Sequence, residues 1–111
     1  MVKRSDSLDG IFGCLSDATR RDILLRLRTK PLTVTEVADE YSMSLAAVSK
    51  HLKILENAGM ITRKQDGRRY LFTLSQQSLQ SPQEFLDKVR SNRDHGKKAS
   101  KGFFSLFTST R

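Results

Sequence analysis

Two consecutive helices are predicted by residues 33–59, TVTEVADEYSMSLAAVSKHLKILENAG. The first begins at Thr33, because Thr33 and Glu36 have the spacing of a capping box, in which each side chain bonds to the other's backbone amide. The second begins at Ser44, whose hydroxyl can cap a helix, and ends before Gly59, which can adopt the left-handed conformation beyond a helix end. Val34, Val37, Ala38 and Tyr41 continue the first helix, and Tyr41-Ser42-Met43 is just long enough for a tight turn.

The second of these helices has two different sides. At 100° per residue its large apolar residues cluster within about 80° of arc, as a stripe that must pack on other helices. These residues are Leu45, Val48, Leu52 and Leu55. The other side carries small and basic residues, namely Ala46, Lys50, Lys53 and Asn57, with Ala47 and Ser49 on the flanks. Small side chains permit close approach to a major groove, serine can hydrogen-bond there and lysine neutralises phosphates, although such a face is often merely solvated.

Two further helices are expected upstream. The first has an apolar face of Leu8, Ile11, Phe12 and Leu15. Asp17 can cap the next helix, in which Ile23, Leu24 and Leu27 form a buried stripe. Lys30-Pro31 should end that helix, because proline disfavours the helical conformation of the residue before it.

A hairpin and a last helix are expected downstream. MITRKQ and RRYLFTLS flank Asp66-Gly67, and two β-prone runs around Asp-Gly are a strong hairpin signal. Ser81-Pro82-Gln83-Glu84 should start another helix, with a cap, a proline in the first turn and a reciprocal Glu. The resulting order, α-α-α-α-β-β-α, is mainly α with a small β-hairpin and predicts a winged helix-turn-helix over residues 1–95. Residues 96–111 are expected to form a flexible basic and aromatic tail.

The predicted hairpin is strongly basic. Arg63, Lys64, Arg68 and Arg69 face a single acidic residue, Asp66. Like charges that lie close together on a hairpin destabilise it, so folding alone does not explain them. A contact with DNA phosphates or with a minor groove would explain these basic residues.

The composition favours nucleic acid as the partner and disfavours several other classes. The chain has 111 residues, with 20 Lys and Arg against 12 Asp and Glu, a net charge of +8 and a pI near 10.1. No apolar run approaches the roughly 18–20 residues of a membrane span, and the N-terminal residues lack the apolar core of a secretory signal. A cytoplasmic protein without membrane contact is therefore expected. Neither a Gly-rich phosphate loop nor a nucleophile–base pair is recognisable, so an enzyme is not expected.

A long continuous segment of the sequence resembles a known protein family. The segment LSDATRRDILLRLRTKPLTVTEVADEYSMSLAAVSKHLKILENAGMITRKQDGRRYLFTL, residues 15–74, resembles the ArsR family of bacterial winged-helix repressors, in the branch with an MSLxAVSKHL recognition helix. The resemblance implies a homodimer that binds an operator in double-stranded DNA and represses transcription. It implies recognition-helix contacts from Ser44, Ala46, Ala47, Ser49 and Lys50, and wing contacts from Arg68 and Arg69. Leu45 stands where many relatives carry Gln, so a base contact made by that Gln would be missing here.

A metal site, a cofactor and a small-molecule inducer are not expected. Metal-binding relatives carry a Cys-x-Cys pair in the third helix, where this chain has Val34-Thr35-Glu36-Val37. A second family site pairs Asp and His across the terminal helices, where this chain has Glu84, Asp87, Asp94 and His95, a poor ligand set. His51 lies beside the buried stripe, and packing or a phosphate contact suits it better than metal binding.

Cys14 leaves one regulatory hypothesis open. As the single cysteine it cannot form a disulfide within the chain, but the resemblance places the first helix in a dimer interface, where Cys14 could act as a redox switch. The alternative is a small packing residue that is inert when buried.

The homodimer also has a physical argument. The first helix (Leu8, Ile11, Phe12, Leu15) and the last (Phe85, Leu86, Val89) carry more apolar surface than one small core can cover. A two-fold interface would bury these faces and set the two recognition helices about one DNA turn, ~34 Å, apart. The alternative is that the last helix folds back on its own chain.

A second class of function remains open. The chain could be a protein-interaction module with a degenerate winged helix, whose aromatic tail recruits a partner. The tail could equally be a DNA arm, a membrane-surface contact or a disordered end.

Overall fold

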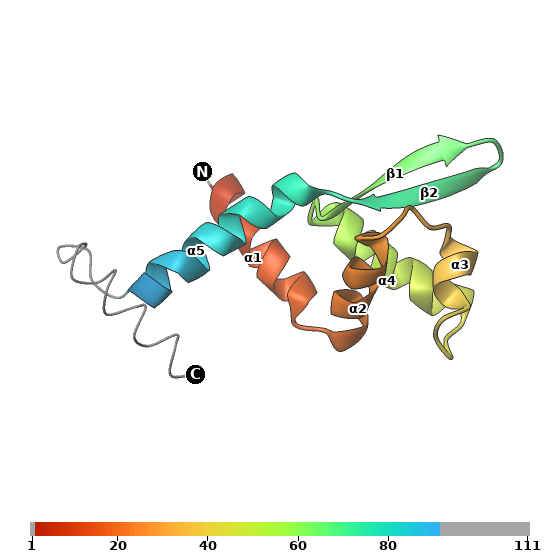
Figure 1. Ribbon diagram of the computed structural model, residues 1–111, viewed down its shortest axis with the longest axis horizontal. Helices are drawn as coiled ribbons and strands as arrows, with labels where there is room; N and C mark the ends of the chain where they lie inside the picture. The colour runs from red at the N-terminus through yellow and green to blue at the C-terminus, as the bar shows by residue number, and fades with distance from the viewer. Residues whose placement is uncertain (1, 92–111) are drawn as a thin grey trace. The chain divides into compact units, whose positions relative to one another are not determined.

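The computed structural model describes residues 2–91, with side chains from Leu8 onward. These residues form five α-helices, one antiparallel hairpin and a 3-10 helix, and the order of helices and strands is the predicted one (Figure 1). In chain order the elements are α1 (Val2–Leu15), α2 (Ala18–Leu27), α3 (Val34–Ala38), α4 (Leu45–Asn57), β1 (Ile61–Asp66), β2 (Arg69–Leu74), η1 (Gln76–Leu79) and α5 (Gln80–Ser91). The fold is a winged helix-turn-helix, mainly helical with a two-stranded sheet.

The chain divides into two compact units. The first extends from Met1 to Gln80 and contains every element before α5, and the second begins at Ser81. The predicted boundary between a domain of residues 1–95 and a tail of residues 96–111 lies outside the described residues and stays a prediction.

One apolar core holds the first unit together. The buried stripes predicted for α2 and α4 are confirmed for Ile23, Leu24 and Leu27 and for Val48, Leu52 and Leu55. The complete set of buried core residues is Ile11, Cys14, Ile23, Leu24, Leu27, Leu32, Val37, Val48, Leu52, Leu55, Met60, Ile61 and Phe72. Helix α4 contacts α1, α2, α3 and β1, so it is the central element of this core.

Two of the predicted apolar residues lie elsewhere than expected. Leu45 is 49% exposed and does not join the stripe, because it occupies the first position of α4, beyond the end of the core. Ile11, predicted for a dimer interface, is only 4% exposed and packs in the chain's own core. Its small exposed area leaves little surface for a second copy, which is a correction to that prediction.

Three helix starts are capped by the predicted side chains. Asp17 accepts from the amide of Arg20 at 3.0 Å, and Ser44 accepts from the amide of Ala47 at 3.1 Å. The capping box of α3 is complete: the Thr33 amide donates to Glu36 at 2.9 Å, and the Glu36 amide donates to the Thr33 hydroxyl at 3.2 Å. The hydrogen bond from the Thr33 amide lowers the pKa of the Glu36 carboxyl, because it favours the charged form.

The connection from α3 to α4 is longer than predicted. Helix α3 ends at Ala38, so the connection begins two residues before the predicted Tyr41-Ser42-Met43 turn. The Tyr41 hydroxyl donates to Asp22 of α2 at 2.5 Å, and this bond lowers the pKa of the Asp22 carboxyl. Burial and the same bond raise the pKa of the Tyr41 hydroxyl. The guanidinium of Arg26 joins both groups at 3.1 Å, so a polar network holds the turn against α2.

The hairpin tip is displaced by one residue from the predicted Asp-Gly. Asp66 pairs with Arg69, so the two-residue loop is Gly67-Arg68, with Gly67 at φ +69°. A positive φ at this position favours glycine. Arg68 therefore lies at the tip itself.

The base of the hairpin is joined to the segment before α3. The Leu32 amide donates to the Phe72 carbonyl at 3.2 Å, and the Phe72 amide donates to the Leu32 carbonyl at 2.8 Å. Because Phe72 is also buried in the core, β2 is fixed at its middle by both backbone and side chain. Beyond this point the hairpin continues on the side of α3, which β2 contacts (Figure 1).

Helix boundaries differ slightly from the prediction at two more places. Helix α2 ends at Leu27, before Lys30-Pro31, and Arg28 is its C-cap residue. Helix α5 begins at Gln80 rather than after a Ser81 cap, because η1 leads directly into it.

Substitution of Gly59 tests its role in ending helix α4. Gly59 has φ +79°, and a Cβ added there would meet nothing within 4 Å. Gly59→Ala should therefore destabilise the chain by about 1 kcal/mol through backbone strain alone. Gly13, inside α1, is the matched control, because its Cβ would also meet nothing within 4 Å and its φ is not positive. Gly13→Ala should stabilise by about 0.5–1 kcal/mol.

Urea unfolding followed by circular dichroism at one fixed protein concentration measures both changes. Equal effects of the two substitutions would contradict the assignment of Gly59 as a conformational stop.

Candidate nucleic-acid interface

The outward side of α4 exposes the predicted small and basic residues. Burial of Val48, Leu52 and Leu55 turns the opposite side of the helix to solvent. Its exposed residues are Ser44, Ala46, Ser49, Lys50 and Lys53, whereas Ala47 is half-buried. Lys50 and Lys53 supply the long side chains of this face, and the small residues Ala46 and Ser49 precede them toward the start of the helix.

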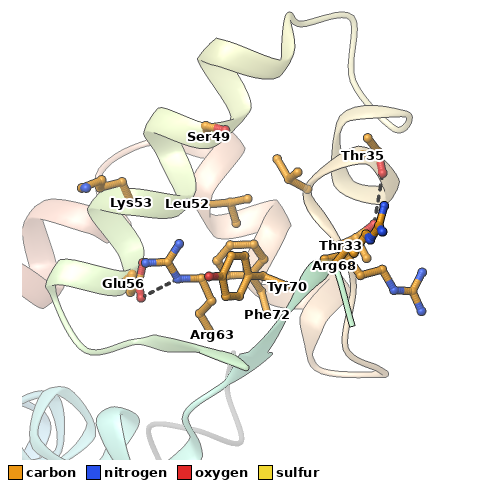
Figure 2. Close-up of a pocket in the computed structure, with 12 residues that line it drawn as sticks. Thr33, Thr35, Ser49, Leu52, Lys53, Glu56, Arg63, Arg68, Tyr70 and Phe72 are labelled. Carbon is orange, nitrogen blue, oxygen red and sulfur yellow. Dashed lines mark hydrogen bonds and ion pairs between the residues drawn. The ribbon is translucent and has the colours of Figure 1, made fainter. Parts of the chain in front are cut away.

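A groove of about 470 Å³ runs between this helix, the start of α3 and the hairpin (Figure 2). Its residues come from the three elements in turn: Thr33, Val34 and Thr35; Ser49, Leu52, Lys53 and Glu56; Arg63, Arg68, Arg69, Tyr70 and Phe72. The groove therefore brings predicted site residues of α4 together with three of the four basic residues of the hairpin.

Arg63 is held in place by two contacts inside the groove. Its Nε lies 3.3 Å from a carboxylate oxygen of Glu56, and its guanidinium carbon lies 4.8 Å from the centre of the Tyr70 ring (Figure 2). A guanidinium over an aromatic face is attracted by the ring quadrupole. These contacts connect the hairpin to α4.

The intrachain contacts revise one sequence argument. Arg69 lies 3.2 Å from Asp66, and Arg63 pairs with Glu56, so folding does account for two of the four basic residues. Lys64 and Arg68 form no ion pair with any described residue, and the same is true of Lys50 and Lys53 on α4. The hairpin and α4 thus present four cationic groups without an acidic neighbour in contact.

Sequence reasoning missed Glu56, Tyr70 and the start of α3 as parts of this site. The hairpin register held a signal for one of them. Arg63 pairs with Phe72, and Gln65 with Tyr70, so Arg63 and Tyr70 are diagonal neighbours on one face. The position of α3 depends on long-range packing and had no comparable signal.

His51 lies in a helix junction rather than on the outward face. The Arg20 guanidinium donates to Nδ1 of His51 at 3.2 Å, and this nitrogen is 3.9 Å from the Asp17 carboxylate. Arg20 also donates to the Cys14 carbonyl at 3.0 Å. His51 therefore helps to join α4 to the ends of α1 and α2.

Cys14 has the surroundings of a packing residue. Its side chain is 2% exposed, and the thiol donates to the Ile54 carbonyl at 3.5 Å. Burial raises the pKa of the Cys14 thiol, and the charge of Arg20 only partly opposes this. A reactive cysteine needs access and a stabilised thiolate, so the structure does not favour the redox hypothesis.

The part of the chain that the structure describes holds no cluster of metal-ligating side chains. Among the described residues, no three His, Cys, Asp or Glu side chains converge as metal ligands would. Glu84 and Asp87 lie on α5, and Asp94 and His95 are outside the described residues. The described helices also include none that is long and apolar enough to cross a membrane.

The residues predicted for a dimer interface differ in exposure. On α5, Phe85, Leu86 and Val89 are 44–62% exposed. On α1, Leu8, Phe12 and Leu15 are half-buried. Among the residues predicted for the dimer interface, the more exposed ones therefore lie on α5.

Comparisons with known proteins agree with this architecture. The family described as "Helix-turn-helix domain" matches residues 15–64. The HTH-type transcriptional regulator Rv2034 of Mycobacterium tuberculosis is 37% identical over 82 residues, which are 74% of this chain and 77% of that protein. The transcriptional repressor SdpR of Bacillus subtilis is 32% identical over 73 residues, 66% of this chain and 81% of that protein.

Solved structures give the same assignment. A crystal structure of the ArsR family transcriptional regulator RHA00566 has a TM-score of 0.72 and 33% identity, and covers 76% of this chain and 92% of that one. An ArsR-like transcriptional regulator from Rhodococcus sp. RHA1 has a TM-score of 0.73 and 25% identity, and covers 90% and 94%. From its sequence and its fold, this chain belongs to the ArsR family of winged helix-turn-helix transcriptional regulators.

Proposed function

We propose that this regulator acts as a homodimer that binds a palindromic operator in double-stranded DNA and represses transcription there. Helix α4 enters the major groove, and the hairpin contacts the backbone or the adjacent minor groove. The relatives named as repressors support the direction of regulation, among them SdpR and the 34% identical SmtB of Mycobacterium tuberculosis. The contacting residues are those of the exposed α4 face and the hairpin, Ser44, Ala46, Ala47, Ser49, Lys50, Lys53, Arg63, Lys64, Arg68 and Arg69.

A single observation carries the proposal: α4 and the hairpin expose cationic side chains that no acidic side chain of the described residues pairs with. Six basic residues meet only two carboxylates in ion pairs on this surface, those of Glu56 and Asp66. Mutual repulsion among the four others is relieved when phosphates come close. The small residues Ala46 and Ser49 precede Lys50 and Lys53 on α4, so the N-terminal half of the helix can approach base edges.

The dimer is supported by α5. Phe85, Leu86 and Val89 recur at helical spacing, so they lie on one side of α5, and all three are exposed. A contiguous group of large exposed apolar side chains marks an interaction site more often than a solvent face. A second copy related by a two-fold axis would cover it and would present two α4 helices to one palindromic operator.

Arg68→Ala should weaken binding to operator and to random duplex alike. Arg68 lies at the hairpin tip without an acidic partner among the described side chains, which suits a phosphate contact. The slope of log K against log salt should fall by about two for a dimer, one for each protomer. Arg28→Ala, at the exposed end of α2, removes the same charge and is the control. Fluorescence anisotropy across a salt series measures the slope, and an unchanged slope would count against a phosphate contact.

Ser49→Ala should instead lower the preference for operator. A side chain that reads a base edge contributes about 1–3 kcal/mol of discrimination, so the ratio of operator to random-DNA affinity should fall about tenfold. Ser42→Ala, in the turn before α4, removes an exposed hydroxyl away from the helix face and should leave the ratio unchanged. Competition binding against random duplex gives the ratio. A loss of the same size on both DNAs would assign Ser49 to the backbone instead.

Val89→Asp should dissociate the dimer. A charge in an apolar interface loses its hydration without gaining a partner. Sedimentation of the native chain should give twice its 12.6 kDa mass, and the variant should give the monomer mass. Ser91→Asp adds the same charge on the opposite side of α5 and should leave the dimer intact. A dimeric Val89→Asp chain would exclude α5 from the interface.

A further inference from the structure

The first turn of α4 presents an apolar surface at the end that is proposed to enter the DNA. Leu45 is 49% exposed, and Ala46 beside it is also exposed. Neither residue belongs to the core or to the apolar side chains packed against it. No acidic side chain lies in this turn, and the Ser44 hydroxyl already caps the helix by accepting from the Ala47 amide.

The charges around this apolar turn indicate which molecule covers it. Ser49 follows Leu45 at the i+4 spacing, so the two lie on one side of α4, and Lys50 and Lys53 are exposed farther along the helix. An apolar first turn followed by lysines suits a partner such as DNA, which has anionic phosphates outside and apolar groups among its bases. A protein surface of purely apolar character would leave both lysines without partners.

The major groove offers one apolar group on its base edges, the 5-methyl of thymine. The other groups on the base edges there are hydrogen-bond donors and acceptors, which neither leucine nor alanine can satisfy. A G·C pair opposite Leu45 would lose water from its polar edge and gain no hydrogen bond. A T·A pair would place a methyl group against the leucine.

We propose that Leu45 and Ala46 contact thymine 5-methyl groups and that each half-site carries thymine where the first turn of α4 enters the major groove. This inference rests on the proposed function and names the chemistry by which it selects DNA. Leu45 and Ala46 determine specificity through apolar contact, and Ser49 and Lys50 bind the neighbouring polar groups.

Uracil substitution tests the contact directly. The full chain is first used to select tightly bound duplexes from a random pool at near-physiological salt. Each thymine of the selected sequence is then replaced by uracil, which lacks the methyl group and keeps the same pairing edge. Replacement at one or two positions of each half-site should weaken binding about three- to fivefold, the value for losing one buried methyl group. Replacement at the other positions should have no effect.

Variants of Leu45 connect the effect to this side chain. Leu45→Ala should bind the thymine and uracil duplexes nearly equally at the position that Leu45 contacts, whereas a second position contacted by Ala46 should stay sensitive. Leu45→Met keeps an apolar side chain of similar volume and should keep most of the difference. Lys53→Ala should bind every duplex more weakly with an unchanged thymine-to-uracil ratio. Thermal unfolding of each variant confirms that the exposed position tolerates the change.

The outcomes separate the inference from the proposed function. Selection of one sequence whose binding is indifferent to uracil everywhere overturns the methyl contact and leaves operator binding intact. A thymine-to-uracil difference that persists in Leu45→Ala at every sensitive position assigns the contacts to other residues and overturns the role of Leu45. Failure to select any sequence contradicts the proposed function itself.

Discussion

The burial of Val48, Leu52 and Leu55 determines the rotation of α4 about its own axis, and every functional feature of this chain depends on that rotation. With these three side chains in the core, Ser49 and Lys50 on the opposite side of the helix are exposed to solvent. Burying three large aliphatic side chains contributes several kcal/mol, on the order of 1.5–3 each. The surface ion pairs of α4 contribute less than this. Packing in the core therefore decides which side of α4 faces solvent.

A second constraint positions the hairpin relative to α4. Leu32 and Phe72 exchange two backbone hydrogen bonds, and the Phe72 side chain is buried. Glu56 and Tyr70 then hold Arg63 between the hairpin and the helix. These exposed contacts are individually weak, so they adjust the direction of one side chain, whereas the backbone pairing and the core determine where the strands lie.

Local rules predicted most of the fold from the sequence. Asp17, Thr33 and Ser44 cap helices as predicted because a cap involves residues only three positions apart. The errors occurred where distant residues decide the outcome. Helix α3 ends earlier than predicted, and the Tyr41 hydroxyl after it bonds to Asp22 and Arg26 of α2, whereas Leu45 is exposed because the core ends before it. Helical periodicity carries no information on either.

The candidate site was predictable as a list of residues but not as an arrangement. Charge and spacing identified Lys50 and Arg68, yet they did not show that Arg63 and Arg69 have carboxylate partners while Lys64 does not.

The exposure of the hairpin has a consequence for its evolution. From Thr62 to Tyr70 every residue is exposed, whereas Ile61 and Phe72 at its base are buried. Mutations in the distal part can accumulate at little cost to folding, so related proteins that share this core are free to diverge in the charge that the hairpin carries.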